Sequence, residues 1–294
     1  MKTPISLRAH AEDEAASLPD LLARAEHLAG AVLLGAHGRR RAGVGDDFWQ
    51  YRPSQIGDSR RMIDHRRSAM GDQEFVRERE WQIAQSVMMW VDQGASMRFA
   101  STDNLPQKAD RARLLGLALS ILLLRGGERV GLTGTTLPPR SGNAQVMRLA
   151  ESFCKDDAED YSPPEHRAMI PHARGVFMSD FMGDIAGVTL ALTKAADRGV
   201  RGVLCHVLDP SEEAFPFKGR TIFESVGGTL RHETLKANDL RDRYLERLAA
   251  RKAELQSLCA LTGWHYVLHH SDASAQSALL WLYGALDTKS GVAA

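Results

Sequence analysis

The sequence predicts an α/β protein in which a doubly wound, mostly parallel sheet is covered on both faces by helices. From Trp81 onward, short apolar runs alternate with long helical segments, the order typical of parallel strands joined by crossover helices. The run SVMMWV at residues 86–91 is almost continuously apolar, as in strands buried on both faces. The chain of 294 residues is 44% hydrophobic, so it is long enough to bury a sizeable core.

The first predicted element is an amphipathic helix over residues 18–34, where apolar residues recur at three- and four-residue spacing. The composition then changes, because residues 35–80 are rich in arginine, aspartate and glycine and contain few aliphatic side chains. We interpret this segment as an arginine-rich arm or small module outside the core. The predicted domains are therefore residues 1–80, the helix with this segment, and residues 81–288, the α/β domain.

The α/β domain is predicted to contain five strands and five long helices in alternation. The strands are expected at residues 86–91, 129–132, 175–178, 202–208 and 264–269. The helices are expected at residues 109–125, 143–153, 184–197, 240–263 and 273–286. Residues 213–233 contain short apolar runs separated by turn residues, which indicates short antiparallel strands.

Charge and cysteine usage narrow the classes of function. Thirty-seven basic and 37 acidic residues give a formal net charge of zero, which argues against a general nucleic-acid binder. The three cysteines, far apart and without a CxxC pair, fit a reducing compartment. The N-terminus lacks the pattern of a secretory signal, and the apolar run at residues 114–124 is too short to cross a bilayer of about 30 Å. We therefore expect a cytoplasmic protein without a membrane segment.

Acidic residues follow several of the predicted strands, at the edge where open parallel sheets bind their ligands. Asp92 follows the first strand of the sheet, Asp180 the third and Asp209 the fourth, and Ser96 adds a hydroxyl group. Carboxylates that converge on one edge repel one another unless a cation lies between them. The pattern therefore predicts a divalent-cation site, with the alternative that each aspartate caps the helix that follows it. The dinucleotide, P-loop and GxSxG motifs are absent from the sequence.

A set of ordered motifs runs through residues 35–80 and continues downstream. It comprises GxH at residue 35, GxGDDF at residue 43, YR at residue 51, GDxxRxID at residue 57 and SA at residue 68. Further matches are the segment 92–97, GERVGL at residue 127 and SDF at residue 179. From about Gly35 onward the chain thus resembles the domain-of-unknown-function-58 family. This resemblance implies a three-layer fold like that of the von Willebrand factor A domain.

The resemblance also implies a function. Many members of the family are similar to partners of MoxR-type AAA+ ATPases, so it implies a non-enzymatic adaptor or assembly protein whose partner is such an ATPase. A-domains bind partners through a metal-ion-dependent adhesion site with the pattern Asp-x-Ser-x-Ser, a later Thr and a later Asp. Here Asp92, Ser96 and Asp180 match, and Gly94 replaces the first Ser. Ser141 is the best placed hydroxyl for the third element, with Thr135 or Thr136 as alternatives. The implied cation is Mg²⁺ or Mn²⁺, in a site weakened by the missing oxygen.

The arm supplies the predicted partner-binding residues, which are Arg52, Gly57, Asp58, Arg61 and Asp64. Arginines interleaved with aromatic rings are also compatible with phosphate or single-stranded nucleic acid. The many carboxylates in this segment favour intramolecular ion pairs, or a protein partner with mixed charges, over nucleic acid.

The alternative from another class is a Mg²⁺-dependent phosphohydrolase of the haloacid-dehalogenase type. Asp92, Thr133, Asp180 and Asp184 can be assigned to its strand-end positions. In that chemistry the residue two positions after the nucleophile is the general acid, and glycine at position 94 cannot donate a proton. We therefore predict that the chain is not an enzyme.

Overall fold

The computed structural model describes residues 19–33, 48–55, 63–69, 71, 73–79, 84–155, 157, 159–226, 228 and 231–287. The chain divides into two compact units. One comprises residues 36–84, and the other, here called the main unit, comprises residues 1–35 and 85–294. The units thus differ from the predicted domains, since the first helix belongs to the main unit.

The main unit is built on a sheet of five parallel strands in the order β4-β3-β5-β6-β9. Their bounds are β3 (Ser86–Val91), β4 (Arg129–Leu132), β5 (Arg174–Ser179), β6 (Arg201–Leu208) and β9 (His265–His270). Each predicted strand agrees with the structure to within one residue at either end. The short, mostly apolar runs form strands here because helices cover both faces of the sheet.

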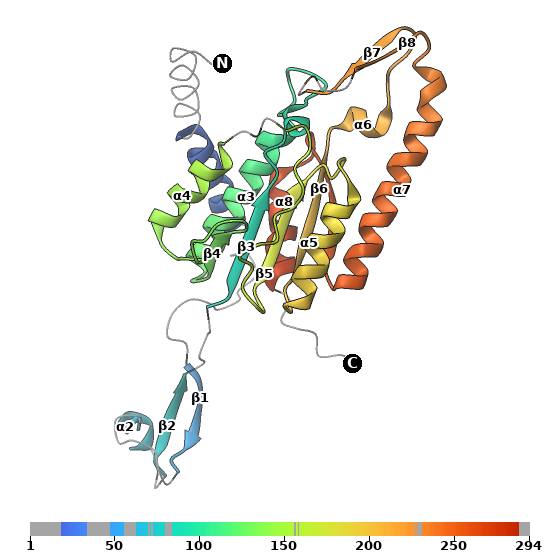
Figure 1. The fold of residues 1–294 in the computed structure, drawn as a ribbon. Coiled ribbons are helices and arrows are strands. Elements are labelled where there is room, and N and C mark those ends of the chain that lie inside the picture. Colours follow the sequence, from blue (N-terminus) through green and yellow to red (C-terminus); the bar gives the residue numbers. More distant parts are fainter. Residues whose placement is uncertain are drawn as a thin grey trace. The chain divides into compact units, whose positions relative to one another are not determined.

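Helices cover the two faces of this sheet in separate layers (Figure 1). They are α3 (Lys108–Arg125), α4 (Asn143–Phe153), α5 (Ile185–Asp197), α7 (Asn238–Thr262) and α8 (Ala275–Asp287). Side chains of α3, α4 and α8 share one hydrophobic core with Val87, Met89 and Val91 of β3. Side chains of α5 and α7 share the other core with Met88 of the same strand. The predicted three-layer α/β fold, like that of the von Willebrand factor A domain, is confirmed.

The helix at residues 19–33 packs on the first of these cores. Leu21, Ala25, Ala29 and Val32 lie on one face of the helix and are buried with the side chains of α3 and α8. Their burial in this core agrees with the assignment of the helix to the main unit. Within the described part of the chain, we find no helix that combines the length and apolar character needed to cross a membrane.

The carboxyl edge of the sheet carries additional short elements. The 3-10 helix η2 (Ala95–Arg98) follows β3, and the short helix α6 (Pro210–Ala214) follows β6. Next comes an antiparallel pair of strands, β7 (Thr221–Glu224) and β8 (Arg231–Thr234), which confirms antiparallel strands in this segment. A cluster of aromatic rings joins the pair to α6 and α7; it consists of Phe215, Phe217, Phe223 and Tyr244.

The unit of residues 36–84 contains a second antiparallel pair, β1 (Phe48–Pro53) and β2 (Phe75–Arg79). The short helix α2 (His65–Ser68) precedes β2. Ile63 forms an isolated bridge with Val76, and Val76 is fully buried. The composition of this segment did not indicate these strands, because alternation of apolar and polar residues is weak there.

Candidate functional site at the carboxyl ends of the strands

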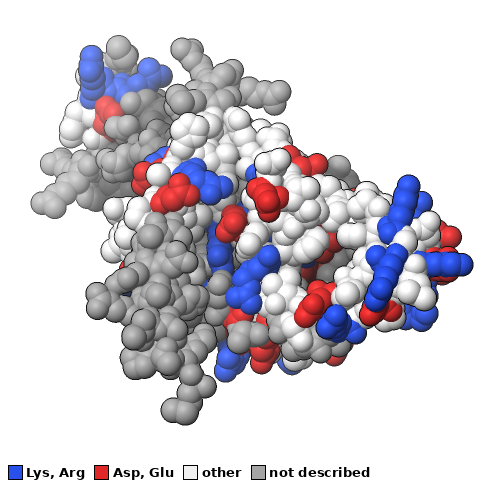
Figure 2. Space-filling view, turned by 90° about the horizontal axis from the view of Figure 1, so that it is seen from above, with Lys and Arg blue, Asp and Glu red and all other residues white. Residues whose placement is uncertain are grey.

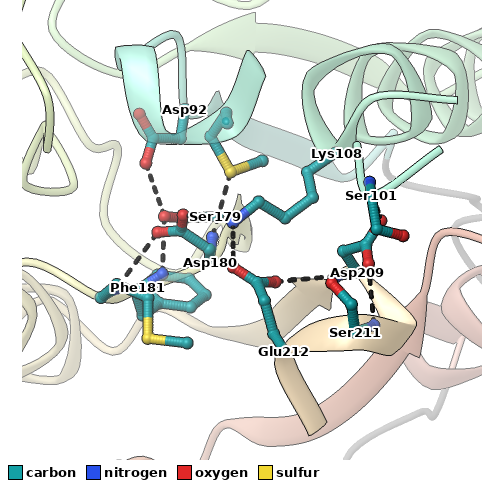
Figure 3. Close-up of polar contacts among 11 residues, drawn as sticks. Asp92, Ser101, Lys108, Ser179, Asp180, Phe181, Asp209, Ser211 and Glu212 are labelled. Carbon is teal, nitrogen blue, oxygen red and sulfur yellow. Dashed lines mark hydrogen bonds and ion pairs between the residues drawn. The ribbon is translucent and has the colours of Figure 1, made fainter. Parts of the chain in front are cut away.

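Three aspartates meet at the carboxyl edge of the sheet (Figure 3). Asp92 follows β3, Asp180 follows β5 and Asp209 follows β6, which are neighbouring parallel strands. All three are buried, with at most 1% of their surface exposed. Buried carboxylates require partners, so the contacts of each one define what this edge can do.

Asp92 is held by two hydrogen bonds from its own surroundings. The Gly94 amide donates to Asp92 Oδ1 at 2.8 Å, and Ser179 Oγ donates to Asp92 Oδ2 at 2.6 Å. Burial and the nearby charge of Asp180 raise the pKa of Asp92 to about 7, although both hydrogen bonds act in the opposite direction. Asp92 therefore holds a proton far more readily than an exposed aspartate does.

Asp180 is paired with a buried lysine. Lys108 Nζ, at the start of α3, lies 2.8 Å from Asp180 Oδ2 and 2.7 Å from Glu212 Oε1. Burial opposes ionisation of Asp180, but the ammonium of Lys108 holds the pKa of this carboxyl below its ordinary value. The same pair of carboxylates raises the pKa of Lys108 against the effect of burial. Asp180, Lys108 and Glu212 thus form an ion-paired group, here called the Lys108 cluster.

Glu212 joins this cluster to α6. Its Oε2 accepts the Asp209 amide at 2.8 Å, while Asp209 Oδ1 accepts the Ser211 amide at 2.8 Å. This reciprocal arrangement is a capping box, which satisfies amides at the first turn of α6. Asp209 Oδ2 also accepts the Ser101 amide at 2.9 Å. Asp209 is thus a helix cap, the alternative that the sequence left open for each aspartate.

The backbone next to Asp180 is constrained. Phe181 has a φ of 46°, in the left-handed region that residues other than glycine seldom adopt. The Phe181 amide donates to Ser179 Oγ at 2.9 Å, and the Met182 amide donates to Asp180 Oδ1 at 3.1 Å. These bonds fix the turn that presents Asp180 to Lys108.

His206 of β6 is also buried near Asp180. Burial lowers the pKa of His206 to about 4, so its imidazole is neutral, and its Nδ1 lies 2.8 Å from the Tyr266 hydroxyl.

Comparison with known proteins identifies the family. A family model described as "Protein of unknown function DUF58" matches residues 50–254. The chain belongs to the DUF58 family. The resemblance found in the sequence is therefore confirmed.

Solved structures similar to this DUF58 protein include two from Bacteroides. One is an aerotolerance-related membrane protein from Bacteroides fragilis carrying multiple mutations to serine, at 15% identity and a TM-score of 0.42. The other is the conserved hypothetical protein BatB from Bacteroides thetaiotaomicron, at 15% identity and a TM-score of 0.39. Each match covers 70% of this chain and 100% of the other. No curated protein matches the DUF58 chain significantly.

The residues at this edge do not fit a divalent cation. The Asp180 and Glu212 oxygens that face each other are occupied by the Lys108 ammonium, and both Asp92 oxygens accept hydrogen bonds. Ser96 Oγ is buried and has no hydrogen-bond partner of normal geometry among the described residues, although its proximity to Asp180 helps to lower the pKa of that carboxyl. The described residues of this DUF58 protein include no group of three His, Cys, Asp or Glu side chains suited to a metal.

Two of the other residues assigned from the sequence lie away from the Lys108 cluster. Ser141 is exposed, and its neighbour Arg140 forms an isolated β-bridge with Val130 of β4. Val130 in turn pairs with Val87 of β3. Val87 precedes Asp92 by five residues, or about 16 Å along a strand, so Ser141 is not part of the cluster. Asp184 is exposed and caps α5 by accepting the Ala186 amide at 3.0 Å.

Thr133 directly follows β4 and is buried, with no hydrogen-bond partner for its hydroxyl in the described part of the chain. Thr133, which the sequence assigned only to the phosphohydrolase alternative, therefore lies nearer the carboxyl edge than Ser141, the hydroxyl expected as the third element of an adhesion site.

The predicted partner-binding residues lie in the unit of residues 36–84. Arg52 is in β1, where it pairs in register with Val76. Gly57, Asp58 and Arg61 lie outside the described residues. Asp64 Oδ1 accepts the Arg66 amide at 3.1 Å and the Arg67 amide at 3.0 Å, which makes Asp64 the cap of α2. Their role in partner binding stays a prediction.

The sequence patterns did not indicate that Lys108 or Glu212 lies at this edge. Glu212 could have been found, because Asp209-Pro210-Ser211-Glu212 has the spacing of a capping box with proline at the first helical position. Lys108 had a weaker signal. A lysine at the start of a helix faces the positive end of the helix dipole, which indicates carboxylates close by.

Proposed function

We propose that this DUF58 protein is a non-enzymatic adaptor that binds a protein partner, and that the partner is a MoxR-type AAA+ ATPase. The observation that carries the proposal is the closure of the carboxyl edge. Asp92, Lys108 and Asp180 are each at most 2% exposed, and each is engaged with groups of the chain itself. A small substrate would have to break these pairs before it reached a reactive group, which argues for binding through the outer surface.

The outer surface beyond this edge has the character of a protein-binding surface. Around β7 and β8, large apolar side chains are exposed, with Ile222 and Val226 at 46% and Leu235 at 73%. Figure 2 shows that lysine, arginine, aspartate and glutamate are interspersed over the described part of this face. Exposed apolar side chains among charges of both signs suit a protein partner better than nucleic acid, because binding the phosphate backbone requires a predominantly positive surface.

The haloacid-dehalogenase alternative gains no support from this geometry. Its nucleophile would be Asp92, whose two oxygens accept hydrogen bonds from the Gly94 amide and the Ser179 hydroxyl. Asp184, the last acidic residue assigned to this alternative, is exposed and caps α5. The general-acid position is Gly94.

The test measures binding between the purified full chain and a purified MoxR-type ATPase of the same organism by biolayer interferometry, with and without nucleotide. We expect saturable binding that the Ile222→Ser, Leu235→Ser double variant weakens at least about tenfold, because apolar anchors dominate such contacts. The matched control is Leu261→Ser. Leu261 is 83% exposed near the other end of α7, about 37 Å along a helix of 25 residues.

Two results would contradict the proposal. One is the absence of binding to the ATPase in every nucleotide state. The other is turnover of a generic phosphate ester that disappears in Asp92→Asn, which would assign the edge to catalysis.

A further inference from the structure

Lys108 lies at the point where the carboxylate that follows β5 meets a carboxylate of α6. Its Nζ is within 2.8 Å of both Asp180 and Glu212, and the residue is only 2% exposed (Figure 3). The nitrogen also lies 5.7 Å above the centre of the Phe99 ring. A cation enclosed by carboxylates and an aromatic face is strongly favoured electrostatically in a buried setting.

The position of this lysine in its helix is unfavourable without those carboxylates. Lys108 is the first residue of α3, where the unpaired amides of the helix already present positive charge. The Lys108 amide donates a hydrogen bond to the Phe99 carbonyl at 3.1 Å, which fixes the position of the backbone that carries the side chain. Since both burial and the helix dipole oppose a cation here, Asp180 and Glu212 are what hold the ammonium in place.

All four carboxylate oxygens of Asp180 and Glu212 already have a partner within the chain. Asp180 Oδ1 accepts the Met182 amide and Glu212 Oε2 accepts the Asp209 amide, so each carboxylate uses its other oxygen for Lys108. A hard divalent cation takes about six oxygen ligands. It would have to expel the ammonium and also take the oxygens of Asp92 away from their donors.

A second segment of the chain is bonded to the loop that follows Asp92. The Ala95 amide donates to the Glu159 carbonyl at 2.8 Å and the Ser96 amide donates to the Asp160 carbonyl at 2.9 Å. The segment 159–162 therefore lies directly on the loop that follows Asp92.

We propose that the Lys108 ammonium takes the place of a divalent cation at the strand ends of this protein, joining β5 to α6, and that removal of its charge uncovers a latent Mg²⁺ or Mn²⁺ site. The ligands uncovered would be Asp180 and Glu212, with Asp92 and Ser96 beside them. The inference concerns the cluster itself and stands independently of the adaptor function.

The test compares thermal unfolding of the full chain in EDTA and in millimolar Mg²⁺ or Mn²⁺, for the wild type, Lys108→Met and Lys108→Met with Asp180→Asn. We expect the wild-type Tm to be the same with and without metal. Lys108→Met should have a lower Tm in EDTA and recover much of it with Mn²⁺, and the added Asp180→Asn should remove that recovery. Lys194→Met is the control, because Lys194 is 53% exposed in its surface pair with Asp197 and should show no metal dependence.

A second measurement uses only the wild-type protein, so it does not depend on whether a variant folds. Native wild-type protein is treated with acetic anhydride, with and without Mg²⁺, and the labelled lysines are mapped by mass spectrometry. Lys108 should stay unmodified in both samples while Lys194 reacts, because Lys108 is buried and Lys194 is exposed.

Three outcomes would overturn the proposal. The first is saturable Mg²⁺ binding by the wild type that Asp180→Asn abolishes, and the second is labelling of Lys108 once Mg²⁺ is added. The third is a Lys108→Met protein whose Tm does not rise with Mg²⁺ or Mn²⁺, whatever its stability in EDTA.

Discussion

At the scale of single residues, Gly94 shows why the edge is closed. A Cβ built at Gly94 would lie 2.9 Å from the Asp160 carbonyl oxygen and 3.0 Å from Asp92 Oδ1. Both neighbours are fixed, the carbonyl by the Ser96 amide and the carboxylate by its two donors. The serine that an adhesion site has at this position would therefore collide with the chain itself. Glycine at position 94 and the buried lysine are two parts of one arrangement.

We expect Gly94→Ala to lower the free energy of unfolding by about 1–3 kcal/mol, the usual cost of overpacking. The backbone at Gly94 has a φ of −59°, which alanine adopts readily, so the loss would come from the collision alone. Chemical denaturation measures it. The matched control is Gly284→Ala in α8, where nothing lies within 4 Å of the added Cβ and alanine should be neutral or stabilising. Equal stability of the two variants would show that the collision does not occur.

Asp92 should make stability fall as the pH rises. Its pKa is about 7 in the folded chain against an ordinary value of 3.8, so the folded state binds the proton more tightly. The stabilisation from this group is complete below pH 3.8 and is lost as the pH rises to about 7, by at most about 1.4 kcal/mol per pH unit. Asp92→Asn removes the titration, so its stability relative to wild type should increase over that interval. Urea unfolding across the range measures the difference, and parallel curves for the two proteins would refute the prediction.

At the scale of elements, the segments with a continuous apolar run or a helical repeat could be predicted, whereas α6, β1 and β2 could not. β3 and α4 match their predicted bounds, because a continuous apolar run and a 3.6-residue repeat each leave a strong pattern. The five residues of α6 are too few for such a pattern.

The candidate site could be predicted only in part, because the ends of the predicted strands indicated Asp92 and Asp180. Lys108 is 72 residues from Asp180 and 104 from Glu212, and no local pattern states which helix start meets which strand end.

The first helix provides a prediction at this scale. Ala25 is fully buried against the core, whereas Ala23, two residues earlier, is exposed. We expect Ala25→Asp to cost at least about 2 kcal/mol of unfolding free energy, since a carboxylate would be buried among apolar side chains. Ala23→Asp makes the same change on the solvent side and should cost about 0.5 kcal/mol, the usual penalty in helix propensity. Thermal or denaturant unfolding distinguishes the two, and equal losses would mean that the helix does not dock on α3.

At the scale of the whole molecule, the two units differ in what stabilises them. The main unit has a five-stranded sheet with a buried core on each face. In the described part of residues 36–84, one two-stranded pair is present and Val76 is the hydrophobic side chain that is fully buried. Two-stranded pairs are marginally stable in water, so the smaller unit depends on few contacts. If this unit also contacts the partner, binding should stabilise it more than the main unit.

Hydrogen exchange on the full chain should therefore separate the units. We expect the amides of β3, β5 and β6 to exchange last, and those of β1 and β2 to exchange at least about 100-fold faster, because local opening of a small unit needs less free energy than global unfolding. Mass spectrometry of peptides covering β1, β2, β3 and β5 measures both rates, and repeating it with the MoxR-type ATPase tests whether β1 and β2 gain protection. Exchange of all these strands at one common rate, with the same dependence on denaturant, would show that the chain unfolds as a single cooperative unit.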